Sequence, residues 1–570
     1  MQTSSYQYRP LQHSNSIRIL VLHPSPNESD PIECTICHED LANGFLCYEA
    51  VSYTWGSSGP THTIRCNDAK ESLSVGRNCH AALRRLRLLR KCRKVWIDAV
   101  CINQEDLLER GHQVRMMKEV YDGASGVIIM LNDVVPECRL LLDELAEVDE
   151  IIDTMGAVYD RVSPSEAIVR QLETLLEDPW FERTWVLQEI HEKLNVCIMY
   201  GSAVIQLDAL ESLYFGHSNT RVTRTPGPAP MRFMSENLNE YDTPQFELWN
   251  RLYMSRKCLA TDPRDRVFAL KSLLGSRQAE MDHLIDYAQS VEECFKRVAK
   301  FLLPVLGLRL LAATRHPHGW DMASWIPDWS QTLPLQFNAF YYETFGNEEP
   351  DDVFSPTNIE NQERALLSYS YNESHTSPTL HVVGCQYAQI VESSQVFRFV
   401  NMDDVERQTR QIYNQFNNLR QHLNEESKID DIETPGHFSG KIFDAMASMD
   451  GGDLDMNLAR FDGSSVHFGS IRKISIQQHS PILYEALQEC SIALMQNGEL
   501  AIVPGAAQDG DVVCIVAGAT APCVLRQSRG GCWMLVSGDC HIFGDEDSNI
   551  AASDAYVDSH RSQVERFVLR

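Results

Sequence analysis

The stretch that decides the fold is K-V-W-I-D-A-V-C-I-N-Q-E-D-L-L-E-R-G-H-Q-V-R, from Lys94 to Arg115. Its residues 95–97 form a short apolar run of strand-favouring side chains, which Asp98 ends. Asn103 can cap a following helix, because its side-chain oxygen can accept a backbone N–H and the first turn after it is acidic. We therefore predict a buried strand that runs into a helix, a junction where α/β proteins place ligand-binding groups.

Apolar runs and amphipathic stretches alternate on both sides of this junction. The strands that we expect lie at residues 17–22, 45–55, 127–131 and 196–200, and the helices at residues 78–89, 140–152 and 165–176. This alternation predicts an α/β domain over residues 15–215 with a doubly wound, mostly parallel sheet that includes Val51, Ile97 and Ile129. The arginines of the 78–89 helix are interpreted as a solvated face.

The remainder of the chain is expected to form three further parts. Residues 216–334 are predicted to be mainly helical, with a Pro-rich linker or loop at 218–244, helices at 246–254, 266–274 and 291–303, and the aromatic segment W-I-P-D-W (Trp325–Trp329) as interdomain packing. Residues 335–475 are predicted to be variable and loop-rich, apart from a helix near 404–423. Residues 476–570 are predicted to form a small β-rich unit, because short apolar runs there are parted by Gly.

Charge and composition exclude several function classes. The chain carries 50 Lys and Arg against 79 Asp and Glu, a net charge of −29, whereas nucleic acids and anionic membranes bind cationic faces. We therefore expect no nucleic-acid partner. No apolar run reaches the roughly 18–20 residues of a membrane span, and the N-terminus lacks a cationic region followed by an apolar one. A cytoplasmic protein is expected.

Cysteine usage points in the same direction. The 17 cysteines are an odd number scattered through apolar runs, which indicates reduced thiols in an intracellular protein rather than a disulfide framework. The tight pair Cys34-x-x-Cys37, followed by His38, lacks the second matching pair that a zinc site needs. We expect no metal site and no resident cofactor.

Four blocks of sequence, in a fixed order, carry the conspicuous motifs. They are Y-E-A-V-S-Y-T-W-G (Tyr48–Gly56), V-W-I-D-A-V-C-I-N-Q-E-D (Val95–Asp106) with E-R-G-H-Q-V (Glu109–Val114), M-x-x-x-Y-x-x-A (Met117–Ala124), and W-F-E-R-T-W-V-L-Q-E-I (Trp180–Ile190). Together they resemble the fungal heterokaryon-incompatibility (HET) domain. A-T-D-P-R-D-R-V-F-A-L (Ala260–Leu270), the W-I-P-D-W segment and residues 510–526 also resemble segments of long HET-domain proteins. The resemblance implies an allorecognition protein that acts in programmed cell death through protein partners.

The HET domain is itself similar to the Toll/interleukin-receptor (TIR) fold, some members of which cleave NAD. That similarity implies a TIR-like sheet and one essential glutamate in a W-x-x-x-E helical motif. In this sequence Trp185 and Glu189 have that spacing. The resemblance therefore implies a TIR-like NAD hydrolase in which NAD is a substrate.

The residues around Glu189 suit that chemistry. On a helix, Glu182, Trp185 and Glu189 would share one stripe. The bond to nicotinamide breaks through a cationic ribosyl-centred state, which a carboxylate stabilises, and an aromatic ring can stack on the substrate. We predict Glu189 as the catalytic residue and Trp185 as a substrate-binding one. The alternative is that Trp185 packs in the core and Glu189 forms a buried ion pair with Arg183 or Arg115.

Trp55, Asp98, Asn103 and Arg183 complete the predicted substrate-binding set, and we expect them to converge with Glu189 around one crevice. Each also has a local interpretation. Asp98 can fix its turn by accepting backbone N–H groups, Asn103 can cap a helix, and Trp55 can be ordinary aromatic core. These alternatives stay open at the level of sequence.

Two functions of different classes follow from the sequence. The first is an intracellular HET-domain effector of allorecognition and cell death, which hydrolyses a glycosidic bond of NAD or another nucleotide. The second is a non-enzymatic protein–protein interaction module that signals by self-association. A carboxylate-bearing crevice favours the first, whereas a large exposed apolar patch favours the second.

Overall fold

The computed structural model describes residues 4–43, 46–56, 59, 61–67, 70–132, 138–155, 165–190, 195–201, 203–218, 230, 243–331, 369–372, 378–398, 407–408, 411, 489–519, 521–542, 557 and 560–570. The chain divides into two compact units, Met1–Asn239 with Lys257–Ala288, and Glu240–Arg256 with Gln289–Arg570. The predicted division into four parts remains a prediction. Most of the helix expected near 404–423 and most of the linker expected at 218–244 lie outside the described residues.

Within the described residues, the first unit is built on a ten-stranded sheet with the order β1-β6-β5-β3-β2-β7-β4-β8-β9-β10. The strands are β1 (Ser4–Ser5), β2 (Ser16–Leu22), β3 (Glu33–Asp40), β4 (Glu49–Tyr53), β5 (His62–Cys66), β6 (Glu71–Val75), β7 (Arg93–Trp96), β8 (Gly126–Met130), β9 (Val196–Tyr200) and β10 (Ala203–Gln206). Its middle part, β7-β4-β8-β9, is parallel, as predicted, and Val51 and Ile129 lie in it.

The sheet as a whole mixes parallel and antiparallel pairs. Strand β2 is antiparallel to both β3 and β7, and β10 is antiparallel to β9. Strands β1, β3, β5, β6 and β10 were not predicted. Strand β3 has the sequence E-C-T-I-C-H-E-D and is only partly buried, so it lacks the apolar run by which β2 was found.

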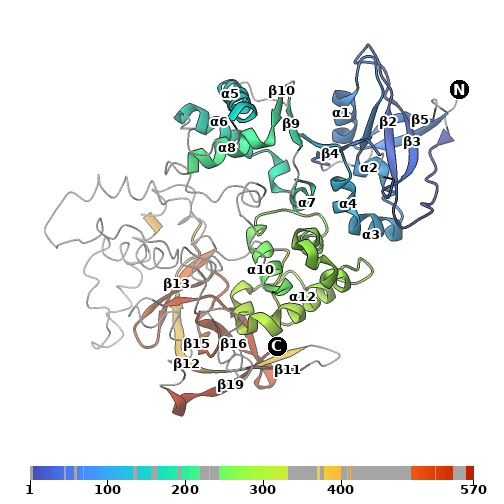
Figure 1. Cartoon of the computed structure of the whole chain (residues 1–570). Helices are drawn as coiled ribbons and strands as arrows, with labels where there is room; N and C mark the ends of the chain where they lie inside the picture. Colours follow the sequence, from blue (N-terminus) through green and yellow to red (C-terminus); the bar gives the residue numbers. More distant parts are fainter. Residues whose placement is uncertain are drawn as a thin grey trace. The chain divides into compact units, whose positions relative to one another are not determined.

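The helices of this unit pack beside the sheet (Figure 1). They are α1 (Arg77–Leu86), α2 (Asp98–Cys101), α3 (Leu107–Arg115), α4 (Met117–Asp122), α5 (Arg139–Met155), α6 (Glu166–Leu176), the 3₁₀ turn η2 (Pro179–Glu182), α7 (Val186–Ile190), α8 (Leu207–Ser218), α11 (Asp265–Phe268) and the 3₁₀ segment η3 (Lys271–Leu284). Helix α1 buries Cys79, Ala82, Leu83 and Leu86, the stripe that helical spacing predicts.

The arginines of α1 do not form the solvated face that we expected. Arg85 donates to the carbonyl oxygens of Leu131 (2.9 Å), Met199 (3.0 Å) and Gly201 (2.7 Å). Arg87, directly after the helix, donates to four further carbonyl oxygens. Guanidinium groups therefore satisfy the carbonyl groups of loops and strand ends, which accounts for the basic run without an anionic partner.

The stretch from Lys94 to Arg115 folds differently from its expected boundaries. Ile97 is fully buried and extended (φ −138°, ψ 121°) just beyond β7, and Asp98 begins the four-residue helix α2. Helix α3 is capped by Asp106, whose Oδ1 accepts from the N–H groups of Leu108 (3.0 Å) and Glu109 (3.1 Å). The expectation that Asn103 caps this helix is wrong, because the helix begins one turn later than the acidic residues suggested.

The second unit combines helices with a second sheet. The helices are α10 (Pro244–Met254), α12 (Val291–Leu306) and the 3₁₀ segment η4 (Gly307–Ala313). Ser290 caps α12 by accepting from Glu293 N (3.3 Å). Its strands are β11 (Tyr369–Asn372), β12 (Thr379–Ser393), β13 (Cys490–Met495), β14 (Leu500–Pro504), β15 (Val512–Val516), β16 (Cys523–Gln527), β17 (Trp533–Ser537), β18 (His541–Ile542) and β19 (Glu565–Leu569).

This second sheet is mainly antiparallel, and its strands β13 to β19 come from residues 476–570, the region predicted to be β-rich. Its long central strand is β12, which pairs with β11, β13, β15 and β19 (Figure 1). That strand comes from the region expected to be loop-rich. Trp325 and Trp329 of the W-I-P-D-W segment are buried within this unit, at 0% and 2% exposure. In the described parts of the chain, no helix has both the length and the apolarity needed to cross a membrane.

Candidate functional site

The centre of the candidate site is the carboxyl group of Glu189 on helix α7. All five residues of α7 are buried, and Glu189 is 1% exposed. The Ser52 hydroxyl on β4 donates to Glu189 Oε2, and Trp180 Nε1 in η2 donates to Ser52 Oγ at 2.6 Å. The Tyr121 hydroxyl on α4 donates to the carbonyl oxygen of Val51 at 3.4 Å and also interacts with Glu189, whose pKa it lowers. Residues from three of the four conspicuous sequence blocks therefore meet at one carboxyl group.

Burial raises the pKa of Glu189 from 4.5 to about 6. The Arg183 charge and the hydrogen bonds from Ser52 and Tyr121 act in the opposite direction, because they stabilise the ionised form. The neighbouring Asp98 carboxylate raises the pKa again. A carboxyl group in this state exchanges a proton close to neutral pH, which is the property of a general acid or base.

The outer part of the site is formed by Asp98 and Trp55. Trp55 is 42% exposed, and its Nε1 donates to Asp98 Oδ2 at 2.8 Å. Asp98 Oδ1 accepts from the backbone N–H of Ala99 at 2.7 Å, so Asp98 also has the turn-fixing contact considered above. Burial raises the pKa of Asp98 although the Arg183 charge and the Trp55 hydrogen bond lower it.

The charge of Arg183 acts on both of these carboxyl groups. Its Nη1 donates to the carbonyl oxygen of Tyr53, at the end of β4. Its charge lowers the pKa of both Asp98 and Glu189, while the Asp98 carboxylate raises the pKa of Glu189. Burial outweighs the effect of this one cation, so both carboxyl groups are easier to protonate than an ordinary surface carboxylate.

The structure brings together four of the six predicted site residues: Trp55, Asp98, Arg183 and Glu189. Trp185 is not among them, because its Nε1 donates to Asp265 Oδ2 at 3.0 Å. The stripe expected from Glu182 to Glu189 is also wrong. Turn η2 ends at Glu182, Arg183 is extended (φ −78°, ψ 132°), and α7 begins only at Val186, so the three residues do not share one helix.

Ser52, Trp180 and Tyr121 were underestimated at the level of sequence. All three lie in the conspicuous sequence blocks, but the sequence gives none of them a role at the site. The signal that could have found Trp180 is its indole N–H, since a fully buried tryptophan needs a hydrogen-bond acceptor. Ser52, a hydroxyl in the buried strand E-A-V-S-Y, is the complementary acceptor.

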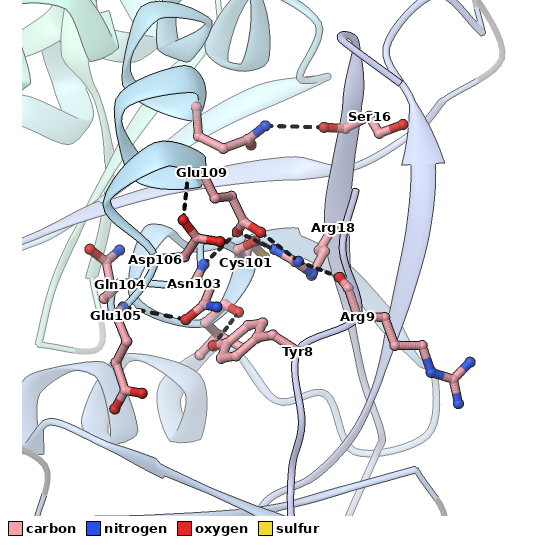
Figure 2. Close-up of polar contacts among 12 residues, drawn as sticks. Tyr8, Arg9, Ser16, Arg18, Cys101, Asn103, Gln104, Glu105, Asp106 and Glu109 are labelled. Carbon is pink, nitrogen blue, oxygen red and sulfur yellow. Dashed lines mark hydrogen bonds and ion pairs between the residues drawn. The ribbon is translucent and has the colours of Figure 1, made fainter. Parts of the chain in front are cut away.

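The remaining predicted site residue, Asn103, belongs to a separate cluster around Arg18 (Figure 2). The fully buried guanidinium of Arg18 donates to both oxygens of Glu109, at 2.6 and 2.9 Å. It also donates to the carbonyl oxygens of Cys101 (3.1 Å) and Arg9 (2.7 Å). The backbone N–H of Asn103 donates to Glu109 Oε1 at 2.7 Å, and its side-chain oxygen accepts from Glu105 N at 3.3 Å. Asn103 therefore supports a buried ion pair and does not face Glu189.

Tyr8 covers this ion pair. The Arg18 guanidinium lies 4.9 Å from the centre of the Tyr8 ring, and the Tyr8 hydroxyl donates to the carbonyl oxygen of Val100 at 3.0 Å (Figure 2). The charges of Arg18 and Glu109 are paired with each other. Their contacts connect strand β2 to the loop between α2 and α3. We interpret the Arg18 cluster as a structural anchor.

Metal binding finds no support in the described residues. In those parts of the chain, no group of three or more His, Cys, Asp or Glu side chains is arranged to hold a metal ion. All 17 cysteines are free thiols, and Cys34 and Cys66 lie on adjacent strands with their sulfur atoms 3.7 Å apart.

Two comparisons with known proteins match part of this chain. A family model described as heterokaryon incompatibility protein (HET) matches residues 48–189. Heterokaryon incompatibility protein 6, OR allele, of Neurospora crassa is 30% identical over 240 residues, which cover 35% of this chain and 35% of that protein. The alignment thus spans about a third of the length of this curated relative. No solved structure matches the chain.

Proposed function

Because residues 48–189 form a heterokaryon-incompatibility domain, we propose that this protein acts in fungal allorecognition as an intracellular effector of cell death. The matched region contains both candidate carboxyl groups, Asp98 and Glu189, and ends at Glu189 itself. The name of the Neurospora relative supports the incompatibility role. The N-terminal α/β unit is the part of the chain to which we assign any activity.

The activity that we propose is hydrolysis of the glycosidic bond between nicotinamide and ribose in NAD. The observation that carries this proposal is the buried carboxyl group of Glu189, whose pKa is raised to about 6, beside the Arg183 charge and a second carboxyl group. As the bond to nicotinamide breaks, positive charge develops on the ribose, and the ionised Glu189 stabilises that charge. Nicotinamide leaves with the bonding electron pair, and water adds to the ribose carbon while it gives one proton to the Glu189 carboxylate.

The other residues have roles that fit this reaction. The exposed indole of Trp55 offers a face on which a planar base can stack, and Asp98 fixes that indole by accepting its N–H. Arg183 provides a cation for the substrate phosphates. Glu189 is 1% exposed, so the proposal requires that substrate binding uncover its carboxyl group. As part of this proposal, the domain is related to TIR domains, as the sequence resemblance implies.

A second candidate is a non-enzymatic signalling module that self-associates. Two observations favour it. The Glu189 carboxyl group is already satisfied by Ser52 and Tyr121 and is closed to solvent. In addition, Leu107 and Leu108 are 62% and 86% exposed at the start of α3, which is unusual for adjacent leucines.

The test compares the full-length protein with two matched variants. Purified protein is incubated with NAD, and nicotinamide release is followed by chromatography. Glu189→Gln keeps the shape of the side chain but removes its charge, whereas Glu182→Gln removes an exposed carboxylate of the same sequence block. We expect release with wild type and with Glu182→Gln, and none with Glu189→Gln. Wild-type protein that triggers death in a fungal host yet releases no nicotinamide would exclude the hydrolase and favour the second candidate.

A further inference from the structure

Helix α7, which carries Glu189, is too short to be stable without contacts to other elements. It has five residues, Val186–Ile190, and all are buried. Isolated helices are marginal below about 12–15 residues, because one turn of hydrogen bonds does not offset the cost of nucleation. The position of the Glu189 carboxyl group must therefore be set by contacts with other elements.

Part of that support comes from a segment beyond the region that the family model matches. Residues 257–288 belong to the first compact unit although the match ends at residue 189. Thr184 N donates to the carbonyl oxygen of Leu259 at 3.1 Å, and Leu259 N donates to the carbonyl oxygen of Glu182. Arg183 and Leu259 thereby form an isolated parallel bridge. The chain that enters α7 is thus paired with the segment 257–288.

Side chains of the same segment hold α7 directly. Asp265 Oδ2 accepts from Trp185 Nε1 at 3.0 Å, immediately before the helix. Ser272 Oγ donates to Gln188 Oε1 at 2.9 Å, next to Glu189. Gln188 is 4% exposed, and its Nε2 also contacts the sulfur of Met117 on α4 at 3.5 Å. Asp265 therefore fixes the side chain of Trp185, directly before α7, and Ser272 fixes that of Gln188 within it.

Asp265 is itself tied to helix α3. The Tyr287 hydroxyl donates to Asp265 Oδ1. The guanidinium groups of Arg110, on α3, and Arg264 each lie 5.2 Å from the centre of the Tyr287 ring. The segment thus connects the E-R-G-H-Q-V block with the W-F-E-R-T-W-V-L-Q-E-I block. Burial raises the pKa of Asp265 to about 6, which agrees with a carboxyl group enclosed by this packing.

We propose that residues 257–288 complete the candidate site and that Asp265 is a positioning residue, which holds α7 through Trp185 so that Glu189 keeps its contact with Ser52 and stays near Arg183 and Asp98. The inference rests on the proposed function for its effect on cell death, but not for its effect on α7. It predicts that the functional unit is discontinuous in sequence and that residues 1–215 alone lack part of the site.

The experiment measures amide hydrogen exchange of residues 186–190 in the full-length protein. Asp265→Ala removes the acceptor for the Trp185 N–H, and we expect exchange of these amides to rise about tenfold, the effect of one lost hydrogen bond on local opening. Asp265→Asn keeps an acceptor oxygen and should restore slow exchange. The matched control is Asp511→Ala, which removes a buried carboxylate paired with Arg526 in the second unit and should leave residues 186–190 unchanged.

A second variant covers the case in which Asp265→Ala unfolds the unit. Trp185→Phe keeps an aromatic ring but lacks the N–H donor, and it should also speed exchange of residues 186–190 while the amides of β2 stay protected. Unchanged exchange in both variants would overturn the proposal, as would Asp265→Asn behaving like Asp265→Ala. In the fungal viability assay, Asp265→Ala should lose killing and Asp265→Asn should retain it. If Glu189→Gln still kills, the proposed function fails, whereas the exchange data continue to judge the positioning role.

Discussion

The Arg18 cluster and the Glu189 cluster lie in the same unit, and both include residues of the Val95–Asp106 block, but their charges are arranged differently. In the Arg18 cluster one buried cation meets one carboxylate through two short hydrogen bonds, and backbone carbonyl oxygens take two further N–H groups. In the Glu189 cluster one cation, Arg183, serves two carboxyl groups, and burial raises the pKa of both.

The difference separates a structural site from a candidate chemical one. A matched, hydrogen-bonded ion pair has no proton to exchange near neutral pH and contributes to holding strands and helices together. Burial destabilises the ionised forms of Asp98 and Glu189 although both groups have hydrogen-bond partners, and carboxyl groups with raised pKa values cluster at functional sites. The following predictions test this contrast, from the largest effect to the smallest.

The largest effect is expected for Arg18→Ala. It leaves Glu109 as an unpaired, nearly buried carboxylate, which should lower the free energy of unfolding by about 3–5 kcal/mol. The control is Arg65→Ala, which breaks the exposed Arg65–Glu33 pair (3.3 Å) and should cost less than about 1 kcal/mol. Urea unfolding of the three proteins measures both values. Equal costs for the two variants would show that the Arg18 cluster is not an anchor.

Glu189→Gln should have the opposite effect, because it should raise the free energy of unfolding at neutral pH. Because the folded state raises the pKa of Glu189 from 4.5 to about 6, its stabilising contribution is fully present below pH 4.5 and is lost as the pH rises through about 6. The glutamine stays neutral, so the variant should be more stable than wild type by about 2 kcal/mol at pH 7.5 and equal to it at pH 4. Unfolding curves across this pH range measure the difference. A variant that is less stable at pH 7.5 would support the alternative of a buried ion pair.

Trp55→Phe should have a smaller effect. It removes the N–H that donates to Asp98 while it keeps an aromatic ring, and the exposed position limits the cost to about 1 kcal/mol or less at pH 7.5. The pKa of Asp98 should rise further, since this hydrogen bond lowers it. The cost should therefore diminish as the pH falls and Asp98 becomes protonated. Thermal unfolding at several pH values tests this, and a cost that does not depend on pH would separate Trp55 from the titration of Asp98.

Asn103→Ala is expected to have the smallest effect. It removes one long hydrogen bond, from Glu105 N at 3.3 Å, while the backbone N–H of residue 103 still donates to Glu109. The free energy of unfolding should fall by only about 0.5 kcal/mol. Thermal unfolding checks this value beside the fungal viability assay. A variant that is fully stable but no longer kills would return Asn103 to the candidate site, contrary to the cluster in which the structure places it.

Local sequence patterns predicted the elements that bury one face or lie wholly inside a sheet. Strands β2, β4, β8 and β9 were found as apolar runs, and helices α1, α10 and α12 by their apolar stripe or their capping residue. Such patterns are visible because burial repeats at short spacing along one element. Strand β3 was not predicted because its side chains are only partly buried. Its apolar residues therefore follow neither the two-residue period of a strand nor the 3.6-residue period of a helix.

The sequence alone also predicted that Trp55, Asp98, Arg183 and Glu189 converge on one site. The prediction was possible because these residues lie at the ends of predicted strands or in one motif block. Only the tertiary structure decided which partner each one has. It assigns Trp185 to Asp265, Asn103 to the Arg18 cluster, and Ser52 and Trp180 to Glu189. The physical reason is that the pKa and the role of a side chain depend on burial and on charges brought from distant parts of the chain, which no local spacing records.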